Sequence, residues 1–183
     1  MPESPPAPSG DAPASTARVS DFSLVVSTAN GTGSQTANLT LLRSIFLMGV
    51  PVHGKNVFPS NIQGLPTWFH IRASRDGWVA RQDPELLVAF NAATLHEDID
   101  ALPPGGVVIR NADLRGAPER DDLVAYDLPV KELMDGVDAA PKLKGYLANM
   151  TYLGAVGWLL GVPLDVLETA LDQQFGGRRK LVD

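Results

Sequence analysis

The sequence predicts an α/β fold: a three-layer α/β/α domain with a mixed, mostly parallel sheet. Short apolar runs rich in β-branched residues recur along the chain, and segments with helical apolar spacing follow several of them. A Gly-x-Gly turn at Gly31–Gly33 separates the first apolar run from the first helical segment. The chain has 183 residues and is 44% hydrophobic, which is enough to bury the core of one such domain.

The first 20 residues differ in composition from the rest of the chain. Residues 1–20 are rich in Pro, Ala and Ser. Such a segment cannot bury enough apolar surface to fold alone. We therefore expect a tail over residues 1–20 that is disordered or ordered by a partner, and one folded domain over residues 21–183.

A strand, a tight turn and a helix are expected at the start of the domain. Phe22–Val26 is an apolar run typical of a buried strand, and Leu39–Met48 has helical spacing. A side-chain oxygen of Ser34 or Thr32 is expected to cap this helix. Gly49 follows its end, where glycine is favoured. The residues expected on its buried face are Ala37, Leu39, Leu42, Ile45 and Phe46.

The later elements continue the α/β pattern. Val50–Val52 begins a second strand, and His53–Pro66 is interpreted as a long polar connection, which is usually functional or interfacial. Further strands are expected at Thr67–Ala73, Trp78–Ala80, Leu86–Phe90, Val107–Ile109 and Leu123–Tyr126, the first two as an antiparallel pair. Helices are expected at Leu95–Leu102, Val130–Met134, Tyr146–Leu160 and Leu164–Phe175.

The charge of the chain is unevenly distributed. The formal net charge is −6, which does not favour binding to nucleic acid or to an anionic membrane. Between Asp21 and Asp76, however, there is no acidic residue. The interval carries the cations Arg43, Lys55, Arg72 and Arg75. It therefore predicts a surface that meets a phosphate, a carboxylate or an acidic subunit, unless the four cations are scattered in space.

Several classes of site are absent from the sequence. The chain has no cysteine, so it cannot supply a thiolate nucleophile or ligate an iron–sulfur cluster, and this composition fits a cytoplasmic protein. The three histidines have no metal-site spacing. A dinucleotide fingerprint would need a third glycine where Thr36 stands, and there is no Walker loop or Gly-x-Ser-x-Gly motif. We expect a binding or assembly domain without catalytic or metal-ligating residues.

Two motifs of the chain resemble those of a known family. The turn Gly31-Thr32-Gly33-Ser34-Gln35-Thr36 is similar to a Gly-x-Gly-Gly-Gln-Gly turn, with two glycines replaced. The segment Pro59-Ser60-Asn61-Ile62-Gln63-Gly64-Leu65 is similar to a Pro-Ser-x-Ile-Arg-Gly-Gly loop, without the arginine and the last glycine. The two motifs that these segments resemble belong to the gamma domain of 2-oxoacid:ferredoxin oxidoreductases. In the 2-oxoglutarate branch this domain is often fused to the front of the alpha subunit.

The resemblance implies a component of a larger enzyme. It implies that alpha and beta subunits are partners, that ferredoxin is an indirect partner, and that thiamine diphosphate, Mg and iron–sulfur clusters lie in those other subunits. Coenzyme A is the implied co-substrate, and the chain itself would be inactive alone. The residues expected to shape the coenzyme A and partner side are Gly31, Gly33, Gln35, Lys55, Asn56, Ser60, Asn61 and Gln63.

Two other interpretations use the same residues. One is a stand-alone nucleotide- or phosphate-binding α/β module, in which the glycine turn and the following helix bind phosphate directly. The other is an interaction scaffold whose glycine-rich turn serves only close packing.

Overall fold

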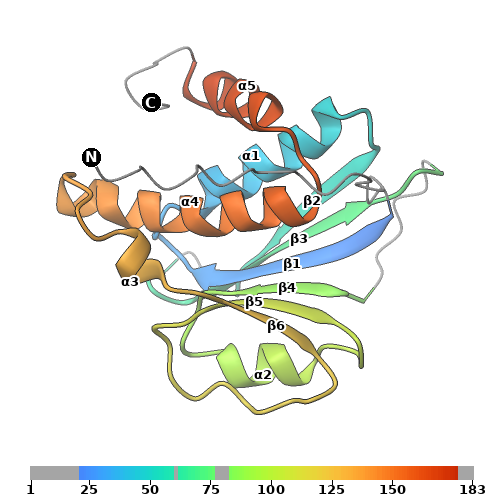
Figure 1. Cartoon of the computed structure of the whole chain (residues 1–183), viewed down its shortest axis with the longest axis vertical. Coiled ribbons are helices and arrows are strands. Elements are labelled where there is room, and N and C mark those ends of the chain that lie inside the picture. The colour runs from blue at the N-terminus through green and yellow to red at the C-terminus, as the bar shows by residue number, and fades with distance from the viewer. Residues whose placement is uncertain (1–20, 60–61, 77–82, 177–183) are drawn as a thin grey trace, which may run out of the picture.

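A six-stranded mixed sheet forms the centre of the molecule. The computed structural model describes residues 21–59, 62–76 and 83–176. The order of the strands is β2-β3-β1-β4-β5-β6 (Figure 1). Their bounds are β1 Phe22–Ala29, β2 Val52–Val57, β3 Pro66–Ala73, β4 Leu86–Ala89, β5 Val107–Asn111 and β6 Val124–Leu128. β1, β4, β5 and β6 are parallel, and β3 runs antiparallel to both β1 and β2, so the predicted mixed, mostly parallel sheet is confirmed.

Helices cover both faces of this sheet, as Figure 1 shows. α1 (Ser34–Leu47) and α4 (Pro141–Leu159) lie on one face, and α2 (Leu95–Asp100) lies on the other. α5 (Leu164–Phe175) packs on the outside of α1, and α3 (Val130–Leu133) precedes α4. The predicted three-layer arrangement is therefore confirmed.

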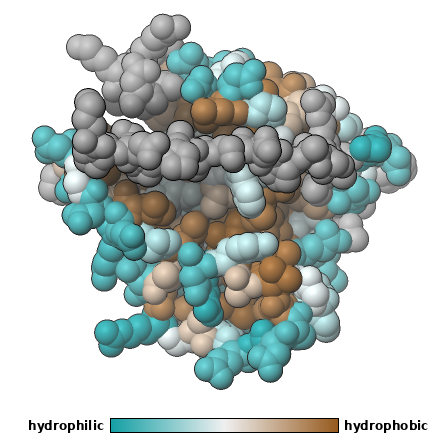
Figure 2. Space-filling view, in the orientation of Figure 1, coloured by the Kyte–Doolittle hydropathy of each residue, from teal (hydrophilic) through white to brown (hydrophobic). Residues whose placement is uncertain are grey.

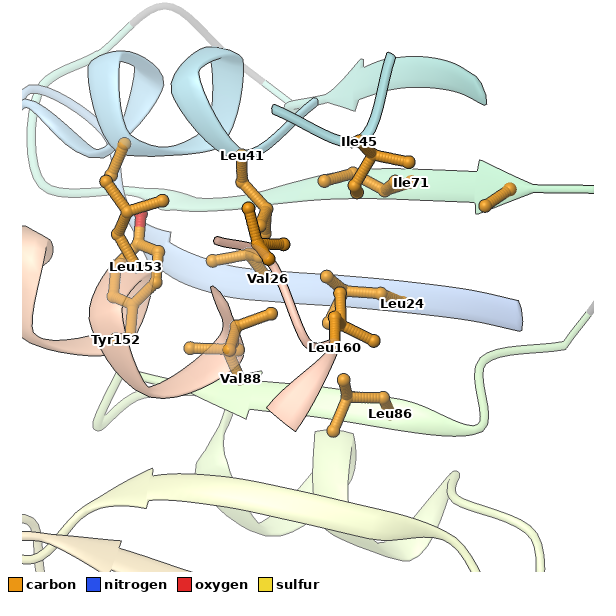
Figure 3. Packing of buried hydrophobic residues seen from close by; sticks show 14 of the residues in the cluster. Leu24, Val26, Leu41, Ile45, Ile71, Leu86, Val88, Tyr152, Leu153 and Leu160 are labelled. Carbon is orange, nitrogen blue, oxygen red and sulfur yellow. The ribbon is translucent and has the colours of Figure 1, made fainter. Parts of the chain in front are cut away.

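Alternate residues of β1 face the two helical layers. Leu24 and Val26 belong to the larger cluster under α1 and α4, whereas Val25 packs with Leu87 under α2. This alternation is the period of two that a strand imposes on its side chains. In Figure 3, Leu24 and Val26 lie between the side chains of α1 and those of α4, with Tyr152 at one end of the cluster.

The first helix buries a different face from the predicted one. It begins at Ser34, and Leu41 is fully buried while Phe46 is 66% exposed. The predicted burial of Ala37 and Ile45 is confirmed, but Leu39 and Leu42 are only partly buried. The apolar spacing misled the prediction because the buried stripe also carries small polar residues, which are Ser34, Asn38, Thr40 and Ser44.

The long polar connection predicted over His53–Pro66 is wrong in its first part. Val52–Val57 forms β2, which pairs antiparallel with β3 so that Lys55 lies opposite His70. The segment is polar because β2 is an edge strand with His53 and Lys55 exposed. Among the described residues, the irregular part of this connection therefore comprises 58–59 and 62–65.

The remaining strands and helices that the structure describes lie close to their predicted positions. The strands at Thr67–Ala73, Leu86–Phe90 and Val107–Ile109 are confirmed within a few residues, as is the helix at Leu164–Phe175. β3 has β1 and β2 on its two sides, and the predicted return at Trp78–Ala80 lies outside the described residues. The tail over residues 1–20 also lies outside them.

Apolar side chains also reach the outer surface. In Figure 2, hydrophobic surface gathers in the middle of the face and hydrophilic residues line its lower border. Large apolar side chains that are exposed include Tyr126, Leu133, Trp158 and Leu164. Within the described residues, none of the helices combines the length and apolar character needed to cross a bilayer.

Candidate functional site

The glycine turn leads directly into the first turn of α1. Gly31 and Gly33 have φ values of 86° and 87°, in the left-handed region that glycine adopts without strain. Gly33 is the N-cap residue of α1, and among the described residues no side chain caps the helix. The predicted cap is therefore wrong: Thr32 Oγ1 donates to the Ala29 carbonyl at 2.9 Å, and Ser34 Oγ accepts from Thr28 Oγ1 at 2.8 Å. The first N–H groups of α1 consequently have no side-chain acceptor in the part of the chain that the structure describes.

Close packing explains why a glycine stands at position 33. A Cβ atom on Gly33 would lie 2.4 Å from the Cδ1 atom of Tyr146, on α4. A Cβ atom on Gly31 would lie 2.8 Å from the Cγ atom of Gln63, whose flexible side chain can move. The turn is held on its α4 side as well, because Asn149 Nδ2 donates to the Thr32 carbonyl at 2.9 Å.

The second motif of the sequence lies against this turn. The backbone N–H of Asn30 donates to the Leu65 carbonyl at 2.8 Å, and the N–H of Gly64 donates to the Asn30 carbonyl at 2.9 Å. Asn30 Nδ2 also donates to the Ile62 carbonyl at 3.2 Å. Residues 30–33 and 62–65 thus form one surface, although about thirty positions separate them in the chain. Ser60 and Asn61 lie outside the described residues.

A chain of side-chain hydrogen bonds joins α1 to the edge of the sheet beside the turn. Asn56 Nδ2 donates to Gln35 Oε1 at 3.1 Å, and Thr67 Oγ1 donates to Asn56 Oδ1 at 3.1 Å. Gln35 and Asn56 were selected from the sequence, whereas Thr67 was missed because it lies in an ordinary strand pattern. The two amides are therefore fixed relative to each other and to the turn.

Lys55 does not join this group. Gly54 faces α1, because a Cβ atom there would lie 2.9 Å from Leu42 Cδ2. Side chains alternate along a strand, so Asn56 also faces α1 and Lys55 faces the other side. Lys55 is exposed and makes no ion pair with any residue that the structure describes.

The acid-free interval does not form one cationic surface. Arg72 pairs with Asp21 and also donates to the Phe22 carbonyl at 3.0 Å. Arg43 Nη1 donates to Gln174 Oε1 on α5 at 3.0 Å. Both guanidinium groups therefore hold the fold together, and Lys55 and Arg75 are the exposed cations of this interval.

Sequence reasoning missed a buried polar cluster at the carboxyl ends of β1 and β4. The hydroxyls of Ser27 and Thr94 lie 3.0 Å apart, and Asn91 Nδ2 donates to the Thr28 carbonyl at 3.1 Å. β1 and β4 are parallel neighbours whose chains continue to opposite faces of the sheet, an arrangement that commonly places a ligand site. The available signal was a set of polar residues at the end of one such strand, Ser27 and Thr28, and after the other, Asn91 and Thr94. Here their hydrogen bonds are made internally, so the cluster supports the turn.

The clearest pKa shifts belong to structural contacts. A hydrogen bond from Arg110 lowers the pKa of Asp127, and these residues are paired across β5 and β6. Arg120 lowers the pKa of Asp122 in the same way, and its guanidinium donates to the Leu102 carbonyl at 2.9 Å, after the end of α2. Burial raises the pKa of the Tyr152 phenol, which donates to Asn38 Oδ1 at 2.9 Å. Among the described residues, no cluster of three or more His, Asp or Glu side chains could hold a metal ion.

The fold and the turn define a class of protein, and comparison gives its family. A mixed sheet whose first strand leads through a glycine turn into a helix is an α/β domain with its candidate site at the carboxyl end of β1. The chain belongs to the pyruvate ferredoxin/flavodoxin oxidoreductase family, which matches residues 23–183. The resemblance seen in the sequence motifs is therefore confirmed at the level of the family.

One curated relative is part of a longer chain. The 2-oxoacid:ferredoxin oxidoreductase 2 subunit alpha of Aeropyrum pernix is 24% identical over an alignment of 203 positions, which covers 89% of this chain and 32% of that protein. The present chain thus spans about a third of the length of this relative.

Solved structures of two kinds share the fold. The gamma subunit of a keto/oxoacid ferredoxin oxidoreductase from Geobacter sulfurreducens has a TM-score of 0.69 at 18% identity, over 88% of this chain and 94% of that one. The pyruvate oxidoreductase subunit PORC from Thermotoga maritima has a TM-score of 0.62 at 16% identity, and the match covers 89% of this chain and 96% of that one. A 2-oxoglutarate:ferredoxin oxidoreductase from Magnetococcus marinus has a TM-score of 0.67 at 20% identity, and the match covers 88% of this chain and 28% of that one. That structure was solved with 2-oxoglutarate, coenzyme A and succinyl-CoA bound.

Proposed function

We propose that this chain is the gamma-type component of a thiamine diphosphate- and coenzyme A-dependent 2-oxoacid:ferredoxin oxidoreductase, and that it shapes the coenzyme A side and a subunit interface. One observation carries the proposal: Asn30, which directly precedes the glycine turn, is hydrogen-bonded to the second motif, so the two motifs that resemble the gamma domain lie side by side. Family membership and the fold of separate gamma subunits support it.

The turn surface has the chemistry for such a role. It combines the uncapped start of α1 with the amides of Gln35, Asn56 and Gln63, which suit the phosphate and polar groups of coenzyme A. Around it, Phe58, Ile62 and Leu65 are exposed apolar residues. Apolar side chains beside polar groups are typical of a surface that a partner chain covers.

The cofactors of the reaction would be held elsewhere. Because the chain contains no cysteine, it cannot ligate iron–sulfur clusters with thiolates, and the proposal assigns those clusters, thiamine diphosphate and Mg to the alpha and beta subunits. The contribution of this chain is to bind and orient coenzyme A through Gln35, Asn56 and Gln63, with ferredoxin as an indirect partner.

Reconstitution tests the proposal. Purified alpha and beta subunits are assayed for coenzyme A-dependent 2-oxoacid oxidation with ferredoxin, with and without this chain. We expect activity only with the chain, and a Gln35→Ala variant is expected to raise the KM for coenzyme A more than it lowers kcat. A Thr169→Ala variant on the exposed side of α5 serves as the control. Full activity of alpha and beta alone would reject the role.

The uncapped glycine turn also favours a second candidate, a stand-alone phosphate-binding module. Calorimetry of the isolated chain with NAD, ATP and coenzyme A separates the two. Tight binding of a nucleotide by the lone chain supports the module, whereas binding of coenzyme A only in the presence of the other subunits supports the oxidoreductase component.

A further inference from the structure

An apolar groove runs between α4 and α5, away from the motifs that the sequence singled out. Its volume is about 430 Å³. The α4 side is lined by Leu143, Leu147 and Met150, and the α5 side by Leu164, Leu171 and Phe175. Leu164 is 70% exposed. A groove of this size with so few polar groups lacks the convergent donors and acceptors that orient a small ligand.

The sequence of α4 indicates that this face is covered in the working protein. There is no charged residue between Tyr146 and Leu160. One side of the helix packs in the core through Tyr152 and Val156, but the side that lines the groove is just as apolar. A helix that is hydrophobic on more than one side is normally buried on each of them.

From these observations we infer that an amphipathic helix of a partner oxidoreductase subunit occupies the groove between α4 and α5; this inference rests on the proposed function. The lining positions of α4 extend from Leu143 to Gly154, about 17 Å along the helix axis, which matches roughly three turns of a docked helix. Glu168 stands in the lining of the groove, and Asp165 and Asp172 lie on the same side of α5. The docked helix therefore carries Lys or Arg beside its apolar ridge.

The first 20 residues of the chain fit the groove less well than such a helix. They contain five prolines, and Met1 and Val19 are their only large apolar residues. They cannot supply a row of large apolar side chains at helical spacing. In the Aeropyrum pernix relative, in contrast, the matching region is only 32% of the protein, so the same polypeptide contains further chain that could supply such a helix.

The groove is connected to the glycine turn through one residue. Tyr146 lines the groove, and its ring also lies over Gly33. A helix seated in the groove would therefore contact the same Tyr146 ring that confines the glycine turn.

Gly154 allows the groove to be blocked without disturbing the fold. It lines the groove, and a Cβ atom there would have no heavy atom within 4 Å. Gly154→Gln is expected to weaken binding of the partner subunit about tenfold or more, measured by interferometry with the full chain and the purified alpha and beta subunits. The control Thr169→Gln adds the same side chain at an exposed position of α5 outside the groove. It is expected to change the affinity for the partner subunit less than about twofold. Thermal unfolding of both variants verifies that they fold.

A photo-crosslinker identifies the occupant. Benzoylphenylalanine is placed at Leu164 in the assembled complex, with the exposed position Gln173 as the control site. An adduct with a basic, amphipathic segment of another subunit supports the inference. An adduct with residues 1–20, an adduct with a second copy of this chain, or no adduct in a complex that has formed would overturn it. If no complex forms with the oxidoreductase subunits, the proposed function fails, and this inference fails with it.

Discussion

Two glycines show how differently the turn and the groove are built. Gly33 stands where no Cβ atom fits, because the ring of Tyr146 already fills that space. Gly154 stands on α4 where the space beside it is open. The first region is closed and its shape is fixed by contacts within the chain, whereas the second remains open on its outer side. The comparison indicates that the turn is complete in the lone chain and that the groove awaits another polypeptide.

Replacement of Gly33 should have the largest effect. Gly33→Ala must adopt φ near 87° and also displace the Tyr146 ring. The left-handed conformation costs about 1–2 kcal/mol for an L residue, and overpacking adds about 1–3 kcal/mol. We expect the free energy of unfolding to fall by about 3 kcal/mol, measured by urea titration.

Gly136 provides the matched control for this change. It has φ near 77°, but a Cβ atom there would have nothing within 4 Å. Gly136→Ala should therefore cost only the conformational part, about 1–2 kcal/mol. Equal losses at the two positions would contradict the claim that Tyr146 confines the turn.

The next largest effect is expected at Tyr152, which joins α4 to the first turns of α1. Its phenol donates to Asn38 Oδ1 at 2.9 Å and lies 3.3 Å from the Ser34 carbonyl, and the residue is fully buried. Tyr152→Phe leaves the buried Asn38 oxygen without this donor, which should lower the free energy of unfolding by about 1–2 kcal/mol. Tyr126→Phe, at a residue that is 44% exposed, is expected to have little effect.

The same phenol gives a dependence on pH with a definite sign. Burial raises the pKa of Tyr152, so the folded chain keeps this proton at a pH where the unfolded chain, with a tyrosine pKa of about 10, loses it. The contribution of the Tyr152 phenol to the free energy of unfolding is therefore fully present below about pH 10. Above that pH it decreases by about 1.4 kcal/mol per pH unit. The stability difference between the wild type and Tyr152→Phe should shrink as the pH rises from 10 to 11. A constant difference would contradict the assignment.

The sequence predicted the turn better than the groove because the two depend on different information. Gly31, Gly33 and Gln35 are recognisable as a local motif, and the Gly64 segment could be matched to a second one. That Asn30 joins the two motifs follows from the pairing of β1 with β3, which brings Ala29 opposite Pro66. Local patterns identify such residues, but only the strand order places them together.

The errors of sequence reasoning came from polar residues in buried positions or in a paired strand. Asn38 and Ser44 are buried on α1 although they are polar. The apolar spacing alone therefore placed Phe46 on the buried face, whereas its side chain is exposed. His53 and Lys55 are exposed on an edge strand, so β2 resembled a loop. The groove was not predictable, because it depends on how α4 and α5 pack, and a row of apolar residues is equally consistent with a closed core.

The hydrogen bond between Asn56 and Gln35 beside the turn should give a smaller effect on stability. Asn56 donates to Gln35 at 3.1 Å, whereas Lys55 faces the other side of β2. A double-mutant cycle of Gln35→Ala and Asn56→Ala should give a coupling energy of about 0.5–1 kcal/mol in urea unfolding. The cycle of Gln35→Ala with Lys55→Ala should give a value near zero. Equal coupling in both cycles would show that the hydrogen bond does not fix the two elements.

Gly154→Ala should give the smallest change, and its sign is opposite to that at Gly33. Alanine is favoured over glycine within a helix by about 0.5–1 kcal/mol, and the position has space for a methyl group. The free energy of unfolding of the lone chain should therefore rise by about 0.5 kcal/mol in urea titration. Because a methyl group occupies little of a groove of about 430 Å³, affinity for the partner subunit should change far less than in Gly154→Gln. Destabilisation by Gly154→Ala would mean that the groove is closed in solution, and the contrast between the two glycines would then be lost.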